Sequence, residues 1–211
     1  MKNIIEALNW RYATKLFNPE KKINQEQLTM ILETLRLSPS SYGMQPWKFI
    51  LVNNLDLKLK IKEASYGQPQ ATDASHLIVL TIKKDIDAKL IESYINFVAS
   101  EKDIPVSKLE GFESMIKGSF QNKTVEELKG WATHQLYLAA GTLLTACATL
   151  EIDACPMEGF DKAKVDEILG LNDLGLESRL LIPIGYRSTE DKSASAKKLR
   201  FSKEDVLIEM N

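Results

Sequence analysis

Apolar residues recur at helical spacing along much of the chain, and polar residues mark where these stretches begin. Asn24 and Gln27 form a capping pair before one such stretch, and Thr124 and Glu127 form another. A side chain that accepts a backbone hydrogen bond at the first turn favours helix initiation at these points. The predicted helices are a short one bearing Ile4, Ile5 and Leu8, and longer ones over residues 25–37, 56–64, 90–98, 124–150 and 161–169.

Short runs rich in β-branched residues predict strands at 49–52, 77–82 and 179–186, with a shorter candidate at 152–155. Pro183 lies inside the third run, and a proline cannot donate to a strand ladder. This predicts an edge position or a bulge for that strand. Asp56 is a candidate cap for the helix over 56–64. Residues 101–122 show no clear period and are interpreted as an irregular segment and a candidate lid.

The order of these elements lacks the regular strand–helix–strand rhythm of a parallel sheet. It predicts an α+β sandwich in which a small mixed or antiparallel sheet is covered by helices. No linker or internal repeat divides the chain, so a single domain over 1–211 is expected. The helix over 124–150 is apolar on most of its sides. One small sheet cannot cover all of it, so the remaining face is expected to pack on a second subunit.

Composition narrows the classes of function. The chain has 211 residues and a formal net charge of -2, so no basic excess favours nucleic acid. The uncharged stretch 130–150 contains polar residues and predicts a buried helix rather than a membrane span. The N-terminal residues lack an apolar signal segment, which predicts a cytoplasmic protein. Cys147, Cys155, His76 and His134 show no metal-ligand spacing, so no metal site is expected.

Familiar nucleotide-binding, hydrolase and kinase motifs are absent from the sequence, and the two histidines leave little scope for acid–base schemes. A bound cofactor is therefore the expected carrier of any difficult chemistry. Four short segments could bind one, and each has a simpler reading. Arg11 and Lys15 would share a face of a helical turn, or form a solvated pair. Residues 38–41 are either a hydroxyl-rich loop that binds a ligand or a loop that ends a helix. Residues 158–159 either allow close backbone approach to a flat ligand or form a simple turn. Residues 198–200 are either a phosphate clamp or a solvated tail.

Taken together and in order, these segments resemble the nitroreductase family of FMN-dependent oxidoreductases. The resemblance runs from Arg11 to Arg200. It is carried by Arg11-Tyr12-Ala13-Thr14-Lys15-Leu16-Phe17, Ser38-Pro39-Ser40-Ser41-Tyr42-Gly43-Met44-Gln45-Pro46-Trp47, Gln68-Pro69-Gln70 with Asp73-Ala74-Ser75-His76, Pro156-Met157-Glu158-Gly159-Phe160-Asp161, and Lys198-Leu199-Arg200.

The resemblance implies an intertwined homodimer that binds FMN at the subunit interface. Arg11, Lys198 and Arg200 are expected to hold the FMN phosphate, and Lys15 to lie by the flavin N1/O2 edge, where it would favour the reduced ring. No side chain is expected to act as a dedicated acid or base. The implied cofactor-binding residues are Arg11, Tyr12, Ala13, Lys15, Gln70, Glu158, Gly159, Lys198 and Arg200, with Pro39, Ser40, Ser41 and Gly43 from the other subunit.

Three positions, in two segments, depart from the family pattern. Gly67 and Gln70 stand where many relatives have an asparagine and a second lysine, and Gly43 replaces an asparagine found in some members. The first departure bears on the flavin's reduction potential and on the choice of nicotinamide, because Gln70 brings a hydrogen-bonding group without a charge.

The implied activity is ping-pong hydride transfer from NADH or NADPH, through flavin N5, to nitroaromatics or quinones. Related flavin chemistry remains open: reduction of free flavin, dehalogenation or pteridine reduction. A flavin-binding or sensor protein without significant turnover is the alternative from another class. The sequence settles neither the physiological acceptor nor the nicotinamide.

Overall fold

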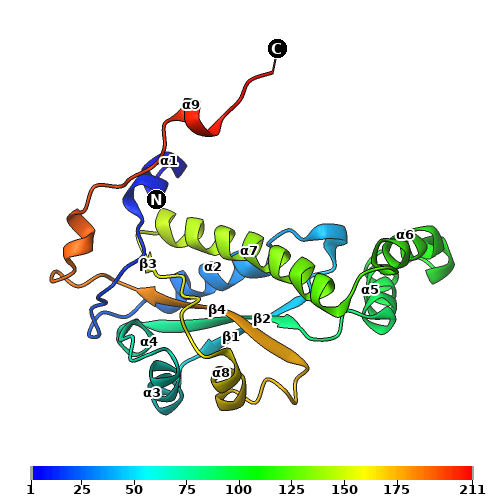
Figure 1. Cartoon of the computed structure of the whole chain (residues 1–211), viewed down its shortest axis with the longest axis horizontal. Coiled ribbons are helices and arrows are strands. Elements are labelled where there is room, and N and C mark those ends of the chain that lie inside the picture. The colour runs from blue at the N-terminus through cyan, green and yellow to red at the C-terminus, as the bar shows by residue number, and fades with distance from the viewer. Residues whose placement is uncertain (1, 211) are drawn as a thin grey trace.

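A four-stranded antiparallel sheet forms the centre of the protein in the computed structural model, which describes residues 2–210 (Figure 1). The strand order is β1-β2-β4-β3, so β1 and β3 are the edges. The strands are β1 (Trp47–Val52), β2 (His76–Lys83), β3 (Asp153–Ala154) and β4 (Leu176–Gly185). All three pairings are antiparallel, which confirms the predicted α+β class with a small sheet.

Helices cover both faces of this sheet, as Figure 1 shows. One core lies between the sheet and α2 with α7, and a second lies between the other face and α3 with α8. The helices are α1 (Ile4–Trp10), α2 (Gln25–Arg36), α3 (Leu55–Ala64), α4 (Gln70–Asp73), α5 (Ala88–Glu101), α6 (Glu110–Phe120), α7 (Val125–Thr149), α8 (Lys162–Ile168) and α9 (Lys203–Val206), with the 3-10 turns η1 (Ser41–Gly43), η2 (Val106–Leu109) and η3 (Lys192–Ser195).

The longest helix, α7, runs across one face of the sheet. Thr124 and Glu127 form the predicted capping box at its start, so the sequence located this helix well. Leu136 and Leu143 are fully buried against the sheet core. Tyr137 and Leu138 lie on the opposite side and are 41% and 51% exposed. The protomer therefore leaves an apolar part of α7 in water, as the sequence predicts.

Of the two alternatives predicted for the strand containing Pro183, the edge position is wrong, and the bulge in this strand lies at Arg179, which the pairing with β2 skips, rather than at Pro183. β4 lies inside the sheet between β2 and β3, and Pro183 pairs with Leu77 of β2. The Pro183 carbonyl accepts from the backbone N of Cys155, so that side of the proline faces β3. β3 is only two residues long, and its ladder with β4 uses Ile184 and Gly185. The missing N–H thus falls just beyond the paired residues and costs the sheet no ladder bond.

Three further local expectations need correction. Residues 101–122 are largely helical, because η2 and α6 pack the side chains of Ile116 and Phe120 into the main core beside α5. Asn54 rather than Asp56 caps α3, and its side chain accepts from the N of Leu57. The chain leaves the helical conformation at Arg11, whose backbone is extended. Arg11 and Lys15 therefore do not share a helical turn.

The C-terminal segment extends away from the body of the protein (Figure 1). It carries α9, opened by a capping box at Ser202, and then continues without regular structure. The exposed apolar side chains of this tail are Leu199, Phe201, Val206, Leu207, Ile208 and Met210, which are between 47% and 91% exposed. Within the protomer these side chains do not join either core.

Candidate functional site

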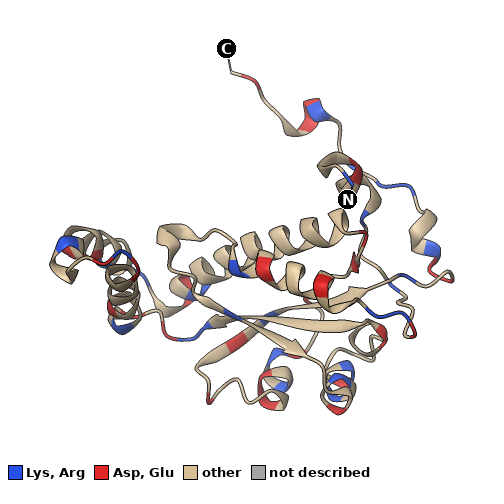
Figure 2. Ribbon diagram, turned by 180° about the vertical axis from the view of Figure 1, so that it is seen from behind, with Lys and Arg blue, Asp and Glu red and all other residues tan. Residues whose placement is uncertain are grey.

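A cavity of about 400 Å³ lies where the chain after α1 meets the chain after η3. Arg11, Lys198 and Arg200 line it, and they come from opposite ends of the sequence. The other lining residues are Asn9, Trp10, Tyr12, Ala13, Ser193, Ala194, Ala196 and Lys197. Figure 2 shows basic segments after α1 and before α9 at the same end of the molecule. None of the lining residues is acidic, so the cavity concentrates positive charge without a neutralising carboxylate.

The cations of this cavity repel one another, and burial and this repulsion together lower the pKa values of Arg11 and Lys198. Burial lowers the pKa of Arg11, and the charge of Arg200 lowers it further. Burial also lowers the pKa of Lys198, with contributions from Arg11 and Arg200. The Lys198 Nζ donates to the carbonyl of Leu8 at 2.8 Å and to that of Arg11. These carbonyls lie at the C-terminal end of α1, where a cation is favoured. Lys198 is thus fixed in place, and its charge remains available to an anion.

A buried ion pair supports the segment that carries Arg11. The Arg187 Nε donates to the two carboxylate oxygens of Asp153 at 2.9 and 3.1 Å, and the Thr14 hydroxyl donates to Asp153 at 3.1 Å. The Arg187 guanidinium also lies over the rings of Trp10 and Tyr12, at 4.2 and 4.6 Å from their centroids. The Asp153–Arg187 pair therefore holds Trp10 and Tyr12 through cation–π contacts and Thr14 through a hydrogen bond.

Lys15 follows the cavity-lining residue Ala13 by two positions in the chain and is exposed. It is not among the cavity-lining residues, but its backbone N donates to Asp191 at 2.8 Å. The position of Lys15 is therefore fixed through its main chain, while its ammonium group is left in water.

Gln70, predicted from one motif, begins α4, and Glu158 and Gly159, predicted from another, lie on a loop that is bonded to the residues just before α4. The Gln68 Nε2 donates to the carbonyl of Gly159 at 2.8 Å. The Tyr137 hydroxyl, from α7, donates to the Glu158 carboxylate. Burial and this bond raise the pKa of Tyr137 to about 12. Gln70 is only 6% exposed, and its Oε1 is a buried acceptor without a hydrogen-bond partner in the described chain.

The predicted loop at Pro39, Ser40, Ser41 and Gly43 is held separately from the cationic cavity. The Ser41 N donates to the Oε1 of Gln135, a buried side chain of α7, at 2.8 Å. None of the four residues lines that cavity. Within one protomer, therefore, the structure joins Arg11, Tyr12, Ala13, Lys198 and Arg200 in one place and holds residues 39–43 apart from them.

Sequence reasoning missed the residues that hold these segments. Asp153, Arg187, Asp191 and Gln135 each bind a predicted site segment but belong to no motif quoted above. Only Asp153 had a visible signal, since it is an acidic residue inside the short apolar run at 152–155. A charge in such a run requires a partner.

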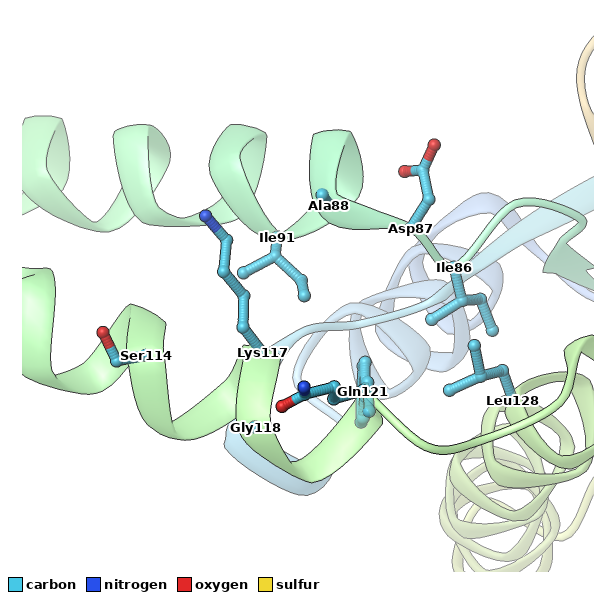
Figure 3. Close-up of a pocket in the computed structure, with 10 residues that line it drawn as sticks. Ile86, Asp87, Ala88, Ile91, Ser114, Lys117, Gly118, Gln121 and Leu128 are labelled. Atoms are coloured by element: carbon cyan, nitrogen blue, oxygen red, sulfur yellow. The ribbon is translucent and has the colours of Figure 1, made fainter.

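A larger cavity, of about 480 Å³, lies between α5 and α6 at the start of α7 (Figure 3). Ile86, Ile91 and Leu128 give it an apolar floor, and Lys117 lies at its rim. Lys117 is paired with Glu113 at 2.6 Å, so its charge is already neutralised. None of the predicted site residues lines this cavity.

The profile of the nitroreductase family matches residues 8–186 of this chain. The chain belongs to the nitroreductase family. This assignment confirms the family resemblance found in the sequence. Two relatives carry the provisional name NAD(P)H nitroreductase. One, from Staphylococcus haemolyticus, is 37% identical over 97% of this chain and 95% of its own. The other, YfkO of Bacillus subtilis, is 36% identical over 97% of this chain and 96% of its own.

Solved structures show the same fold. A protein from Bacillus subtilis, named provisionally as the nitroreductase ydfN, aligns with a TM-score of 0.85 at 23% identity, covering 98% of both chains. A provisionally named nitroreductase from Exiguobacterium sibiricum, solved in complex with FMN, aligns with a TM-score of 0.81 at 23% identity. That alignment covers 100% of this chain and 98% of the other.

Other features of this nitroreductase-family chain bear on its chemistry. Over residues 2–210, no helix is long and apolar enough to cross a membrane. In the same range, no cluster of three or more histidine, cysteine or acidic residues could hold a metal ion. Cys147 and Cys155 are both buried and free, and burial raises the pKa of each thiol. They are therefore poorly suited to act as nucleophiles.

Proposed function

We propose that this protein is a homodimeric FMN enzyme that oxidises NADH or NADPH and reduces nitroaromatics or quinones. The observation that carries the proposal is the cavity between α1 and the C-terminal segment. Arg11, Lys198 and Arg200 gather there, with Lys197 also on the lining and no acidic side chain among the lining residues. These like charges repel one another until an anion binds between them.

The donor chemistry of this cavity fits a phosphate monoester. Two guanidinium groups offer paired donors for phosphate oxygens, and the Lys198 ammonium adds a point charge. Each charge-assisted hydrogen bond contributes about 1.5–3 kcal/mol. Arg11, Lys198 and Arg200 would hold the phosphate of FMN. Tyr12 and Ala13, which line the same cavity, would lie along the ribityl chain.

The remaining predicted residues suit the ring of the flavin. Lys15 would place a positive charge near its pyrimidine edge, and the loop at Glu158 and Gly159 would offer backbone amides. The buried Oε1 of Gln70, which lacks a partner in the described chain, could accept a hydrogen bond from a ring N–H. An acceptor of this kind costs about 1–3 kcal/mol when it is left unpaired, so binding the ring would remove a penalty.

When bound, FMN supplies hydride transfer at N5, alternately from NAD(P)H and to an acceptor on the same face of the ring, which gives ping-pong kinetics. The protein's part is to bind and orient. Lys15 would stabilise negative charge at the pyrimidine edge, and the Tyr137–Glu158 hydrogen bond would fix the loop that carries Gly159. No side chain is assigned the role of a dedicated acid or base.

Dimerisation would cover the apolar surface that the protomer leaves in water. The tail side chains Phe201, Val206 and Ile208 are 82%, 69% and 81% exposed, and Leu138 of α7 is 51% exposed. Surface of this kind is typical of a protein interface. β1 is an edge strand, so a second copy could extend the sheet there. The loop at Pro39, Ser40, Ser41 and Gly43 would then reach the flavin of the partner.

Flavin content is the first test of the proposal. The purified protein is expected to be yellow and to release about one FMN per chain on denaturation, identified by chromatography. Arg200→Gln should weaken FMN binding at least tenfold, because it removes one guanidinium from the cavity. Arg36→Gln is the matched control, since that exposed arginine pairs with Glu33 at the C-terminal end of α2 and does not line the cavity. A colourless protein that takes up no added FMN would refute the assignment.

Turnover then separates the enzyme from a flavin-binding or sensor protein. Steady oxidation of NADH or NADPH is expected with menadione or nitrofurazone as acceptor, with parallel double-reciprocal plots. Stopped-flow reduction by each nicotinamide gives the preference between them. Bound flavin that is reduced but not reoxidised by any acceptor in a panel would favour the sensor reading.

A further inference from the structure

Asp191 lies between the two chain segments that supply the cations of the anion cavity. It follows β4 and is the N-cap residue of η3, which leads toward Lys198 and Arg200. Asp191 is 4% exposed and does not line the cavity itself. A ligand in the cavity would therefore meet the neighbours of Asp191 but not its carboxylate.

The carboxylate of Asp191 is shared between these two segments. Its Oδ2 accepts from the Lys15 N at 2.8 Å, the Tyr12 hydroxyl at 2.9 Å and the Leu16 N at 3.1 Å. Its Oδ1 accepts from the Ser193 N at 3.0 Å. One side chain thus joins the segment that contains Arg11 and Lys15 to the turn whose Ser193 lines the cavity.

Charge strengthens this connection. Burial alone would raise the pKa of Asp191, but the hydrogen bonds from Leu16, Lys15, Tyr12 and Ser193 outweigh it and lower the pKa. The group is therefore a carboxylate at neutral pH, and bonds to a charged acceptor are stronger than neutral ones. Asp191 adds to the direct bonds from Lys198 to the carbonyls of Leu8 and Arg11, and both connections oppose the mutual repulsion of Arg11, Lys198 and Arg200.

We propose that Asp191 is a positioning residue that fixes the Arg11–Lys15 segment relative to the Lys198–Arg200 segment. By holding the cations of both segments around one cavity, Asp191 creates the preference of this site for a phosphorylated flavin over the unphosphorylated one. The inference rests on the proposed function. Asp191 has a specific task, because loss of its carboxylate should weaken the contacts to the phosphate and leave the contacts to the flavin ring unchanged.

Asp191→Asn tests this task, because the amide keeps the size of the side chain and one acceptor oxygen but removes the charge. Dissociation constants for FMN and for riboflavin, which lacks the phosphate, are measured by flavin fluorescence on protein reconstituted after flavin release. The wild type should bind FMN at least 100-fold more tightly than riboflavin. The variant should lose at least tenfold of that ratio, with riboflavin affinity changed less than threefold.

Two further variants keep the test decisive. Tyr12→Phe removes only one donor to Asp191 and should reduce the ratio in the same direction by a smaller factor, even if Asp191→Asn folds poorly. Asp161→Asn is the matched control, because Asp161 is also an aspartate N-cap, at α8, and does not line the cavity. Asp161→Asn should leave the ratio unchanged, because asparagine is an equally good N-cap and the cavity is not touched.

The outcomes distinguish the two claims. An unchanged FMN-to-riboflavin ratio in Asp191→Asn would overturn the inference while leaving the proposed function intact. Equal weakening of both flavins would also overturn it, because that pattern indicates a general structural role. A wild-type protein that binds neither flavin would overturn the proposed function, and the inference with it.

Discussion

The hydroxyl of Tyr94 lies 2.6 Å from the position that a Cβ on Gly43 would take. It is held there because it donates to the carbonyl of Tyr42 at 2.7 Å. Tyr94 belongs to α5, whereas Gly43 ends the hydroxyl-rich loop at η1, so this contact ties the loop to the α5–α6 pair. Gly43 also has a φ of +73°, a conformation that glycine adopts at little cost. Glycine at this position, where some members have asparagine, thus has a local steric reason.

Gly43→Ala should lower the free energy of unfolding by about 2–3 kcal/mol, from backbone strain of about 1–2 kcal/mol and the clash with Tyr94. Tyr94→Phe alone should cost about 1 kcal/mol, for one lost hydrogen bond. The double variant should cost less than the sum, because Phe removes the clashing oxygen. Denaturant unfolding at fixed protein concentration measures this coupling, and strict additivity would show that the contact is absent.

Lys58 makes stability depend on pH. It is 5% exposed and donates to the carbonyls of Ala74 and Ser75 at 3.3 and 3.2 Å. Burial, with the nearby charge of Lys22, lowers the pKa of Lys58 from 10.5 to about 8. Between these values the unfolded chain holds a proton that the folded chain has lost. The free energy of unfolding should therefore rise with pH across this window.

Lys58→Met should abolish that rise, which amounts to at most about 3 kcal/mol at about 1.4 kcal/mol per pKa unit. The variant's stability relative to wild type is thus greatest below pH 8 and declines toward pH 10.5. Lys60→Met, an exposed position in the same helix, serves as the control and should leave the pH profile unchanged. Urea unfolding at a series of pH values gives the comparison, and parallel profiles for wild type and Lys58→Met would contradict the prediction.

Gln70→Lys should raise the midpoint potential of the bound flavin by a few tens of millivolts. A second cation beside Lys15 would stabilise the reduced ring more than the oxidised one, and about 30 mV corresponds to about 1.4 kcal/mol for a two-electron couple. Because Gln70 is buried, the variant without flavin should also be less stable. A xanthine oxidase titration with a reference dye measures the potential, with Gln70→Met as the uncharged control. An unchanged or lower potential at full FMN occupancy would show that Gln70 does not face the pyrimidine.

Deleting the chain after Phe201 should weaken dimerisation and, as a consequence, FMN binding. The deleted residues include Val206 and Ile208, which the protomer leaves 69% and 81% exposed. Light scattering across a dilution series measures the dimer, and released flavin fluorescence measures FMN. Val206→Ser with Ile208→Ser should reproduce part of the effect at full chain length. A truncated protein that remains a tight dimer with bound FMN would exclude this role for the tail.

Local chemistry allowed the sequence to predict the elements of the fold. The capping pairs at Asn24 and Thr124 located the starts of α2 and α7, because a helix start depends on side chains within one turn. The strand runs were located to within a few residues for the same reason, since alternation and β-branching are local properties. Only the family resemblance predicted that residues 198–200 and Arg11 bind the same group. In the structure both line one cavity, although most of the sequence separates them.

Only the tertiary structure decided what depends on long-range contacts. Pro183 could be placed inside the sheet only once the two-residue length of β3 was known. Residues 106–120 are helical because their apolar side chains pack beside α5, a partner that the local pattern does not reveal. Asp191 binds Tyr12 across 179 positions of sequence, and Asp153 binds Thr14 across 139. Such pairings carry no periodic signal, because a buried carboxylate is stabilised by whichever donors the fold brings to it.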